Sequence, residues 1–319
     1  MGVPANKYFQ EKYLSDERVD SLIKQIEIAK EACIIAEKSK NADSIFKAEI
    51  NLGEIYQKQF RYDLAIEIYF KALKISDSTN TKKNKAKALH QIGSIYLDIR
   101  NLDLAHEYLT KSLAIKNKLN DKKSIASTQN SLALTYWLQG HLNTALDHLF
   151  KTLSIDQEIN DTDGMARRFN NIGIVYHEKK QYSLALEYLN KALEIKRGTS
   201  DLWATAETLN NIGENYISQE KYNKAIDVLT EAQGIAKRLN ALILLSDNYR
   251  YFSRLYKQTN KFKEALIYHE LFINLEDSLF SRDKYSIISE LKSSFEIEKR
   301  KRIFNCKIKK LSCWKRKRK

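Results

Sequence analysis

The sequence predicts an all-α protein, a right-handed superhelical solenoid of stacked antiparallel helix pairs. Three observations support this prediction. One residue pattern returns six times at a spacing of 40 residues without an insertion, and repeats of this length are typical of solenoids. The 319 residues include one proline and nine glycines, few enough for long helices with short connections. Within each copy, apolar residues follow the spacing of an amphipathic helix.

Each copy carries a small residue, a tyrosine three residues later and an alanine twelve residues after the small one. The small residues are Gly53, Gly93, Ala133, Gly173, Gly213 and Ser253. The tyrosines are Tyr56, Tyr96, Tyr136, Tyr176, Tyr216 and Tyr256. The alanines are Ala65, Ala105, Ala145, Ala185, Ala225 and Ala265. Helices that cross closely need little bulk at the crossing, so the small residues predict where the two helices of a pair approach.

The turn inside each pair carries an apolar residue at a fixed place, which we expect to hold the hairpin together. These turn residues are Tyr62, Leu102, Leu142, Tyr182, Tyr222 and Phe262. One helix pair cannot bury its apolar face alone, so neighbouring pairs are expected to stack.

The elements follow in order along the chain. A helix over roughly 18–40 is expected to cap the array, within an N-terminal segment 1–42. Six repeats are expected over 43–281. Their first helices lie near 43–59, 83–99, 123–139, 163–179, 203–219 and 243–259. Their second helices lie near 62–78, 102–118, 142–158, 182–198, 222–238 and 262–278. A C-terminal helix is expected over 282–298, and residues 299–319 form a basic tail.

The connections between pairs are polar, and their side-chain oxygens suit the free N–H groups of the next helix. These connections are Asp77-Ser78-Thr79-Asn80, Asn120-Asp121, Asn160-Asp161 and Ser200-Asp201. Such residues cap helix N-termini by accepting a backbone hydrogen bond. We therefore expect each first helix to begin directly after one of these connections.

The net charge of +14 lies mainly in the tail. Residues 299–319 hold twelve Lys and Arg and no acid, so removing these charges leaves +2 for the other 298 residues. The tail has three open interpretations. It is a solvated, disordered segment, or a patch for nucleic acid or an anionic membrane, or a frameshifted coiled-coil remnant. Read one base earlier with A-rich codons, it gives KEKNIQLQNKKIELLEKK, whose apolar spacing is close to heptad.

The sequence contains no signal for catalysis, a cofactor or a metal. The six histidines form no i, i+4 pair, and the chain has no glycine-rich phosphate loop and no GxSxG motif. Cys33 lies in an apolar helical stretch and is expected to be a small core residue. No run approaches the ~20 apolar residues of a membrane span, and the N-terminus lacks a signal-peptide core. We expect a non-enzymatic, cytoplasmic protein, or a periplasmic sensor domain if an export signal is missing.

The repeated pattern resembles the tetratricopeptide repeat over roughly residues 45–278. It has (Leu/Ile)-Gly-x-x-Tyr, then alanine, a bulky residue four later and alanine three after that. The period departs from the family's usual ~34 residues, which implies longer helices or an extra turn. The family's aromatic residue early in the first helix is mostly absent. That position holds Glu49, Leu89, Gln129, Phe169, Leu209 and Tyr249. The longer-period form is similar to repeat domains of bacterial sensor and regulator proteins.

The resemblance implies that the first helices line a concave groove that holds ligands. Asparagine both donates and accepts hydrogen bonds, which suits the backbone of an extended peptide. The groove positions early in the helices hold Asn130, Asn170 and Asn210, with Asn51, Asn171 and Asn211 adjacent. The later positions hold Trp137, His177 and Ile217, and the arginines expected to meet acidic groups are Arg167, Arg168, Arg250 and Arg254. Alternatively, the asparagines bond neighbouring helices and stabilise the stack.

These observations favour a non-enzymatic scaffold that binds a peptide or protein segment in the concave groove. A second hypothesis is the sensor portion of a bacterial signal-transduction protein, a histidine kinase or transcriptional regulator, lacking its output domain. A third is association with nucleic acid or an anionic membrane through Lys299–Lys319. The sequence leaves the oligomeric state and the identity of the ligand open.

Overall fold

The computed structural model describes residues 16–59 and 61–277, and within these ranges all regular structure is helical. A further helix covers residues 262–277 of the described chain. The predicted helix over 282–298 and the basic tail lie outside the described residues. The other helices are α2 (Asp16–Ser39), α3 (Ala42–Lys58), α4 (Tyr62–Ser78), α5 (Lys82–Asp98), α6 (Leu102–Leu119), α7 (Lys122–Leu138), α8 (Leu142–Glu158), α9 (Thr162–Glu178), α10 (Tyr182–Gly198), α11 (Leu202–Ser218), α12 (Tyr222–Arg238) and α13 (Leu242–Gln258).

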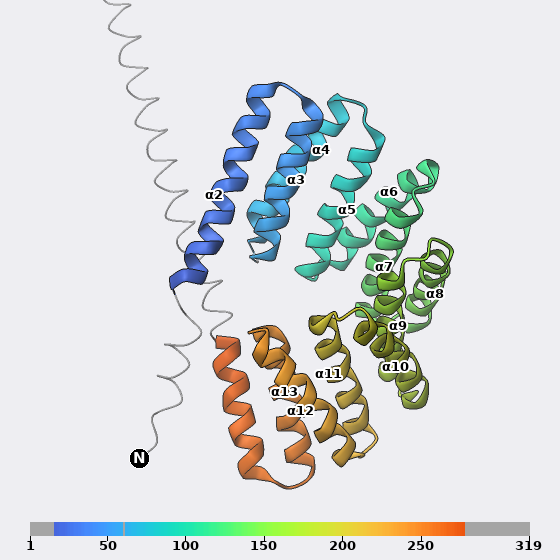
Figure 1. Cartoon of the computed structure of the whole chain (residues 1–319). Coiled ribbons are helices and arrows are strands. Elements are labelled where there is room, and N and C mark those ends of the chain that lie inside the picture. The colour runs from blue at the N-terminus through green and yellow to red at the C-terminus, as the bar shows by residue number, and fades with distance from the viewer. Residues whose placement is uncertain (1–15, 60, 278–319) are drawn as a thin grey trace, which may run out of the picture. The chain divides into compact units, whose positions relative to one another are not determined.

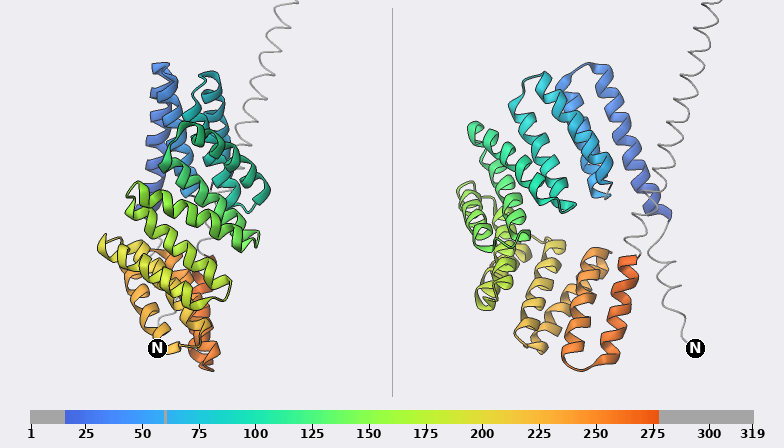
Figure 2. Two further views of the ribbon diagram at one scale, coloured as in Figure 1. Left: turned by 90° about the vertical axis from the view of Figure 1, so that its right-hand side faces the viewer. Right: turned by 180° about the vertical axis from the view of Figure 1, so that it is seen from behind.

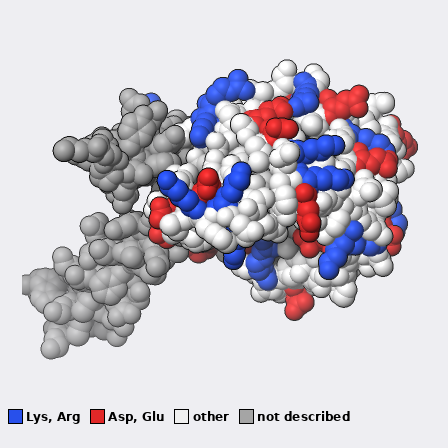
Figure 3. Space-filling model, turned by 90° about the horizontal axis from the view of Figure 1, so that it is seen from below, with Lys and Arg blue, Asp and Glu red and all other residues white. Residues whose placement is uncertain are grey.

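The trace falls into two compact units, Met1–Phe272 and Ile273–Lys319, and the architecture described here is that of the first. Each helix packs against the next one in the chain, from α2 to α13, and successive helices run antiparallel (Figures 1 and 2). The fold is therefore the expected all-α solenoid of stacked helix pairs. Figure 3 shows acidic and basic side chains interspersed on one face, as expected for repeats close to neutral.

The 40-residue period arises from helix length. The repeat helices have 17 residues, except α6 with 18. Between them, a left-handed residue recurs every 20 positions, as at Asn80, Arg100 and Asn120. The next N–H closes the preceding helix, as where Asn101 donates to the Tyr96 carbonyl at 2.8 Å. Longer helices, and not longer loops, therefore produce the period.

In three connections between pairs, one residue caps the next helix and the residue before it takes the left-handed conformation. Asp121, Asp161 and Asp201 accept hydrogen bonds from backbone N–H groups three residues ahead and cap α7, α9 and α11. The residue before each aspartate takes the left-handed conformation, which asparagine tolerates better than most residues. The predicted caps are thus confirmed at these connections, although Thr81 makes no side-chain capping bond to α5.

The small residues lie where the two helices of a pair cross. A Cβ built on Gly173 would come within 2.6 Å of Cγ of Leu189, and one on Gly93 within 2.7 Å of Cγ of Leu109. Both leucines and the marker alanines Ala105 and Ala185 are fully buried. The second helix therefore fills the space that the missing side chain leaves, as the repeat pattern predicts.

The tyrosines of the pattern pack inside the same pair. Tyr96 stacks on Tyr108 with ring centroids 5.5 Å apart, and Tyr176 stacks on Tyr188 at the same distance. The marker positions are therefore structural and face the core.

At the N-terminal end of the stack, Cys33 is buried in the core as expected, and burial raises the pKa of its thiol to about 11.

Neighbouring units meet through buried polar pairs that differ from one junction to the next. Between α6 and α7, Nζ of Lys116 donates to Oγ1 of Thr128 at 2.7 Å, and burial lowers the pKa of Lys116 to about 8. At the equivalent junction between α8 and α9, Nε of Arg168 lies 3.0 Å from Oδ2 of Asp156. The two junctions thus pair their buried polar groups differently. The ion pair between Arg168 and Asp156 leaves Nε of Arg168 and both carboxylate oxygens without a hydrogen bond among the described residues.

Substitution of two glycines tests the helix crossing. Gly213→Ala should lower the free energy of unfolding by about 1–3 kcal/mol, because the new Cβ would lie 2.5 Å from Cγ of Leu229. Gly234 lies on α12 with open space around its Cα, so Gly234→Ala should stabilise the protein by roughly 1 kcal/mol. Urea denaturation followed by circular dichroism measures both changes. Similar effects of the two substitutions would contradict the close crossing.

Candidate binding surface on the first helices

The odd-numbered helices form a continuous wall. In addition to their partners, α3 contacts α5, α5 contacts α7, α9 contacts α11, and α11 contacts α13. A side-chain hydrogen bond from Asn171 to Asn130 joins α9 to α7. We call the exposed face of α3, α5, α7, α9, α11 and α13 the first-helix wall. This is the surface on which the sequence places the ligand groove.

Two asparagine pairs join neighbouring helices along this wall. Nδ2 of Asn171 donates to Oδ1 of Asn130 at 2.9 Å, which connects α9 to α7. Nδ2 of Asn211 donates to Oδ1 of Asn170 at 3.0 Å, which connects α11 to α9. The alternative role left open by the sequence, bonding between helices, is therefore present at these four residues. Asn51, the equivalent of Asn171 in the first unit, is exposed.

Asn210 lies deeper, in a buried amide network. Its Nδ2 donates to the Leu244 carbonyl at 3.0 Å, and its Oδ1 accepts from Nδ2 of Asn248 at 2.9 Å. Oδ1 of Asn248 in turn accepts from Gln233 at 3.1 Å. Asn210 is 3% exposed, so its side chain is committed to the stack. The sequence did not predict a role for Asn248. A comparison of the units singles it out, because no other unit has asparagine there and the equivalent positions hold Ala48, Ala88, Thr128, Arg168 and Thr208.

Trp137 and Asn171 meet at a small apolar cavity between α7 and α9. The cavity has a volume of about 10 Å³, and its wall also includes Leu134 and Ile174. Both aliphatic residues are partly exposed on the first-helix wall. The sequence argument missed them because it followed polar residues. An indole beside two aliphatic side chains and an amide offers both apolar contact and a hydrogen-bonding group.

The other two residues predicted to contact a ligand late in the first helices, His177 and Ile217, differ in how far a ligand can reach them. The ring of His177 lies 5.4 Å from that of Tyr182, and its Nδ1 is buried without a hydrogen bond in the part of the chain that the structure describes. Ile217, expected beside the ligand, is 1% exposed and belongs to the core. Its placement in the groove is therefore wrong.

The four arginines fall into two groups. Arg254 is partly buried against Glu214 at 3.2 Å, and Arg250 pairs with Asp247 at 2.8 Å. Arg168 points into the junction with α8, so its placement on the groove is wrong. Arg167 is exposed on α9 and makes no ion pair among residues 16–59 and 61–277. Of the four, it is the guanidinium most available to an acidic ligand.

Acidic groups occupy the C-terminal part of the wall. Glu207 on α11 is largely buried, and this burial, with Asp247 and Asp201 nearby, raises the pKa of its carboxyl to about 7. Within the described ranges, no three His, Cys, Asp or Glu side chains are placed to hold a metal ion. The wall thus offers hydrogen-bonding, apolar and charged groups along successive units.

Comparison with known proteins agrees with this architecture. Family models described as tetratricopeptide repeat match residues 44–118, 124–198 and 206–238. These matches and the stacked helix pairs define the protein as a repeat solenoid, and the chain belongs to the tetratricopeptide repeat family. The sequence matches no curated protein at a significant level. Among the helices that the structure describes, none has the length and apolar character needed to cross a membrane.

Solved structures with the same fold are distant in sequence. A Rap protein complexed with Competence and Sporulation Factor is 17% identical, with a TM-score of 0.58 over 76% of this chain and 81% of that chain. Aspartyl phosphate phosphatase F from Bacillus subtilis is 13% identical, with a TM-score of 0.59 over 86% and 85%. A STAND protein with a tetratricopeptide repeat sensor, from Pyrococcus horikoshii, is 17% identical, with a TM-score of 0.60 over 91% of this chain and 47% of that chain.

The pKa of Glu207 predicts a pH dependence of stability. Between its ordinary value of 4.5 and about 7, the folded protein binds more protons than the unfolded chain at this residue. The stability that Glu207 contributes is therefore present at low pH and lost as the pH rises through this window. Relative to the wild type, Glu207→Gln should gain up to about 3 kcal/mol between pH 4.5 and pH 8.

Denaturation at a series of pH values, with the exposed Glu194→Gln as a control, measures this difference. Parallel stability curves for the wild type and Glu207→Gln would contradict the burial of this carboxyl.

Proposed function

We propose that the protein is a non-enzymatic interaction scaffold that binds an extended peptide or protein segment along the first-helix wall. The observation that carries the proposal is the partly exposed patch where the apolar side chains of Trp137, Leu134 and Ile174 lie beside the amide of Asn171. Membership of a family of interaction repeats supports it, as does the similar fold of a Rap protein complexed with Competence and Sporulation Factor.

The wall combines the groups that such a ligand requires. A ligand side chain packs on the partly exposed surface around Trp137, since the cavity of about 10 Å³ is too small to admit one. Burial of apolar surface at this place contributes most of the affinity. The asparagine pairs retain hydrogen-bonding capacity, because an asparagine side chain has two N–H donors and an acceptor oxygen. Each pair uses only one donor of one residue and the acceptor oxygen of the other. Arg167 pairs with an acidic ligand residue. Since the helices hold these groups in place, binding requires little reordering of the receptor.

A peptide selection tests the proposal. Peptides selected from a random library on the full chain are measured by fluorescence anisotropy against the wild type, Trp137→Ala and Asn171→Ala. We expect each substitution to weaken binding about tenfold, which corresponds to roughly 1.4 kcal/mol. Lys151→Ala on α8, an exposed residue off the wall, should leave the affinity unchanged. Peptides whose affinity ignores the wall substitutions but falls with Lys151→Ala would contradict the proposal.

A second candidate is the sensor portion of a larger signalling protein. The similarity to the STAND protein favours it, because 91% of this chain aligns with 47% of a protein that carries a tetratricopeptide repeat sensor. In that case the same wall binds the signal and passes it to an output domain. Sequencing the encoding locus decides the point: a kinase or DNA-binding frame directly downstream supports this candidate, and an unrelated neighbouring gene counts against it.

A further inference from the structure

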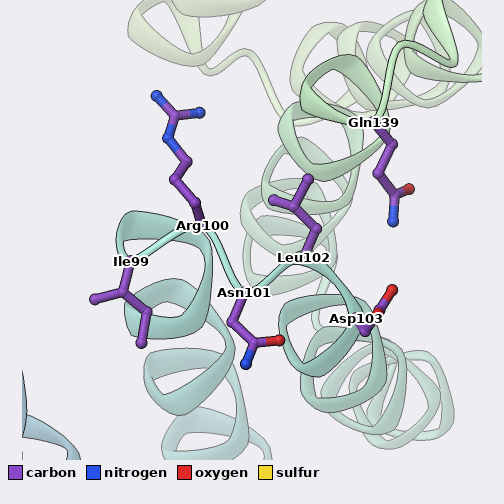
Figure 4. Close-up of a pocket in the computed structure, with 6 residues that line it drawn as sticks. All are labelled: Ile99, Arg100, Asn101, Leu102, Asp103 and Gln139. Carbon is purple, nitrogen blue, oxygen red and sulfur yellow. The ribbon is translucent and has the colours of Figure 1, made fainter.

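A second concave site lies at the helix turns, separate from the cavity at Trp137. The turn between α5 and α6 and the end of α7 enclose a shallow pocket of about 490 Å³. In Figure 4, the side chains of Asp103 and Gln139 point toward one another, while Arg100 extends away from Asp103. Leu102 contributes an apolar side chain between Arg100 and Gln139.

The pocket continues into a second lobe of about 340 Å³, which shares Asp103 and Gln139 and adds His106, Tyr136 and His141. Nε2 of His106 lies 2.9 Å from the Tyr136 hydroxyl, and the ring of His141 meets that of Tyr136 edge-on at 6.3 Å. We call the two lobes together the turn-edge pocket.

Comparison of the units with each other shows that the pocket coincides with local departures from the repeat. His106 replaces an aliphatic residue, since the equivalent positions hold Ile66, Leu146, Leu186, Ile226 and Leu266. Leu102 replaces the aromatic turn residue that four units carry at Tyr62, Tyr182, Tyr222 and Phe262. At the next turn Gly140 carries no side chain, and a Cβ there would meet no atom within 4 Å.

These departures act in one direction. A smaller turn residue removes bulk, while a histidine in an aliphatic position brings a polar group to the space that is left. Packing alone does not call for this change, because five other units fill the position of His106 with Ile or Leu. The coincidence of lost bulk and added polarity at one place is what a built ligand site requires.

We propose that the turn-edge pocket binds a lysine or arginine side chain of a partner protein. The carboxylate of Asp103 is exposed and makes no hydrogen bond or ion pair in the described part of the chain. Gln139 offers an amide oxygen as a hydrogen-bond acceptor. The ring of Tyr136, which stacks on His148, adds an aromatic surface that attracts a cation. An organic cation suits this lining, because one carboxylate, one amide oxygen and an aromatic ring together match an ammonium or guanidinium group.

Blocked tripeptides test this proposal on the full chain. The probes are acetyl-Gly-Arg-Gly-amide, with the Gln and Glu peptides as controls, and the readout is the imidazole C–H resonances assigned by single substitutions. We expect saturable shifts of His106 and His141 with the Arg peptide alone, while His269 stays unchanged. Asp103→Asn should weaken this binding at least tenfold. Asp63→Asn, the same position in the first unit, should leave it unchanged.

A second variant separates binding from folding. Leu102→Tyr introduces the residue that three other units carry at this position, so we expect a normal unfolding transition together with loss of the shifts. Absence of saturable shifts at His106 and His141, or full binding by Leu102→Tyr, would overturn the proposal. A response to the Glu peptide alone would also overturn it and would indicate an acid-binding site at Arg100. None of these outcomes depends on the first-helix wall.

Discussion

The close crossing of the two helices in each pair is the constraint on which the rest of the structure depends. Leu189 and its equivalents lie over glycines whose Cβ position is already occupied. This contact fixes how far each first helix is rotated about its axis, and therefore which residues face the next unit. Side chains 41 residues apart then meet repeatedly, as in the pairs Asn130–Asn171 and Asn170–Asn211. The close helix crossing therefore determines which residues form the first-helix wall.

The turns keep this arrangement in register. A left-handed residue every 20 positions ends each helix at the same point, and the N–H of the following residue closes it. An insertion in one turn would rotate the following helix and separate the small residue from its leucine, which explains why the six copies carry none. The family membership identifies the stack as an array of tetratricopeptide repeats. Departures such as His106 and Asn248 show where this chain differs from a uniform repeat.

The sequence alone predicted the fold well, because helix boundaries and the crossing depend on local pattern. Helices α3 to α13 begin and end within about a residue of the predicted positions. The candidate site was harder to predict, since a polar side chain on a first helix has a choice of partners. Asn210 and Arg168 turn into junctions, and Ile217 into the core, because the neighbouring unit supplies contacts that spacing does not reveal. Comparing equivalent positions for departures would have found His106 and Asn248.

If every unit presents the same crossing and the same two faces, one whole period can be removed without loss of fold. The direct test is the thermal unfolding of a chain that lacks residues 82–121. In this chain Ser76 meets Thr128 at the new junction, and neither residue is charged. A chain lacking 82–115 instead removes the ~34 residues usual in the family. The account predicts a cooperative transition and retained helicity for the first deletion and a broad, early transition for the second. Equal behaviour of the two chains would contradict it.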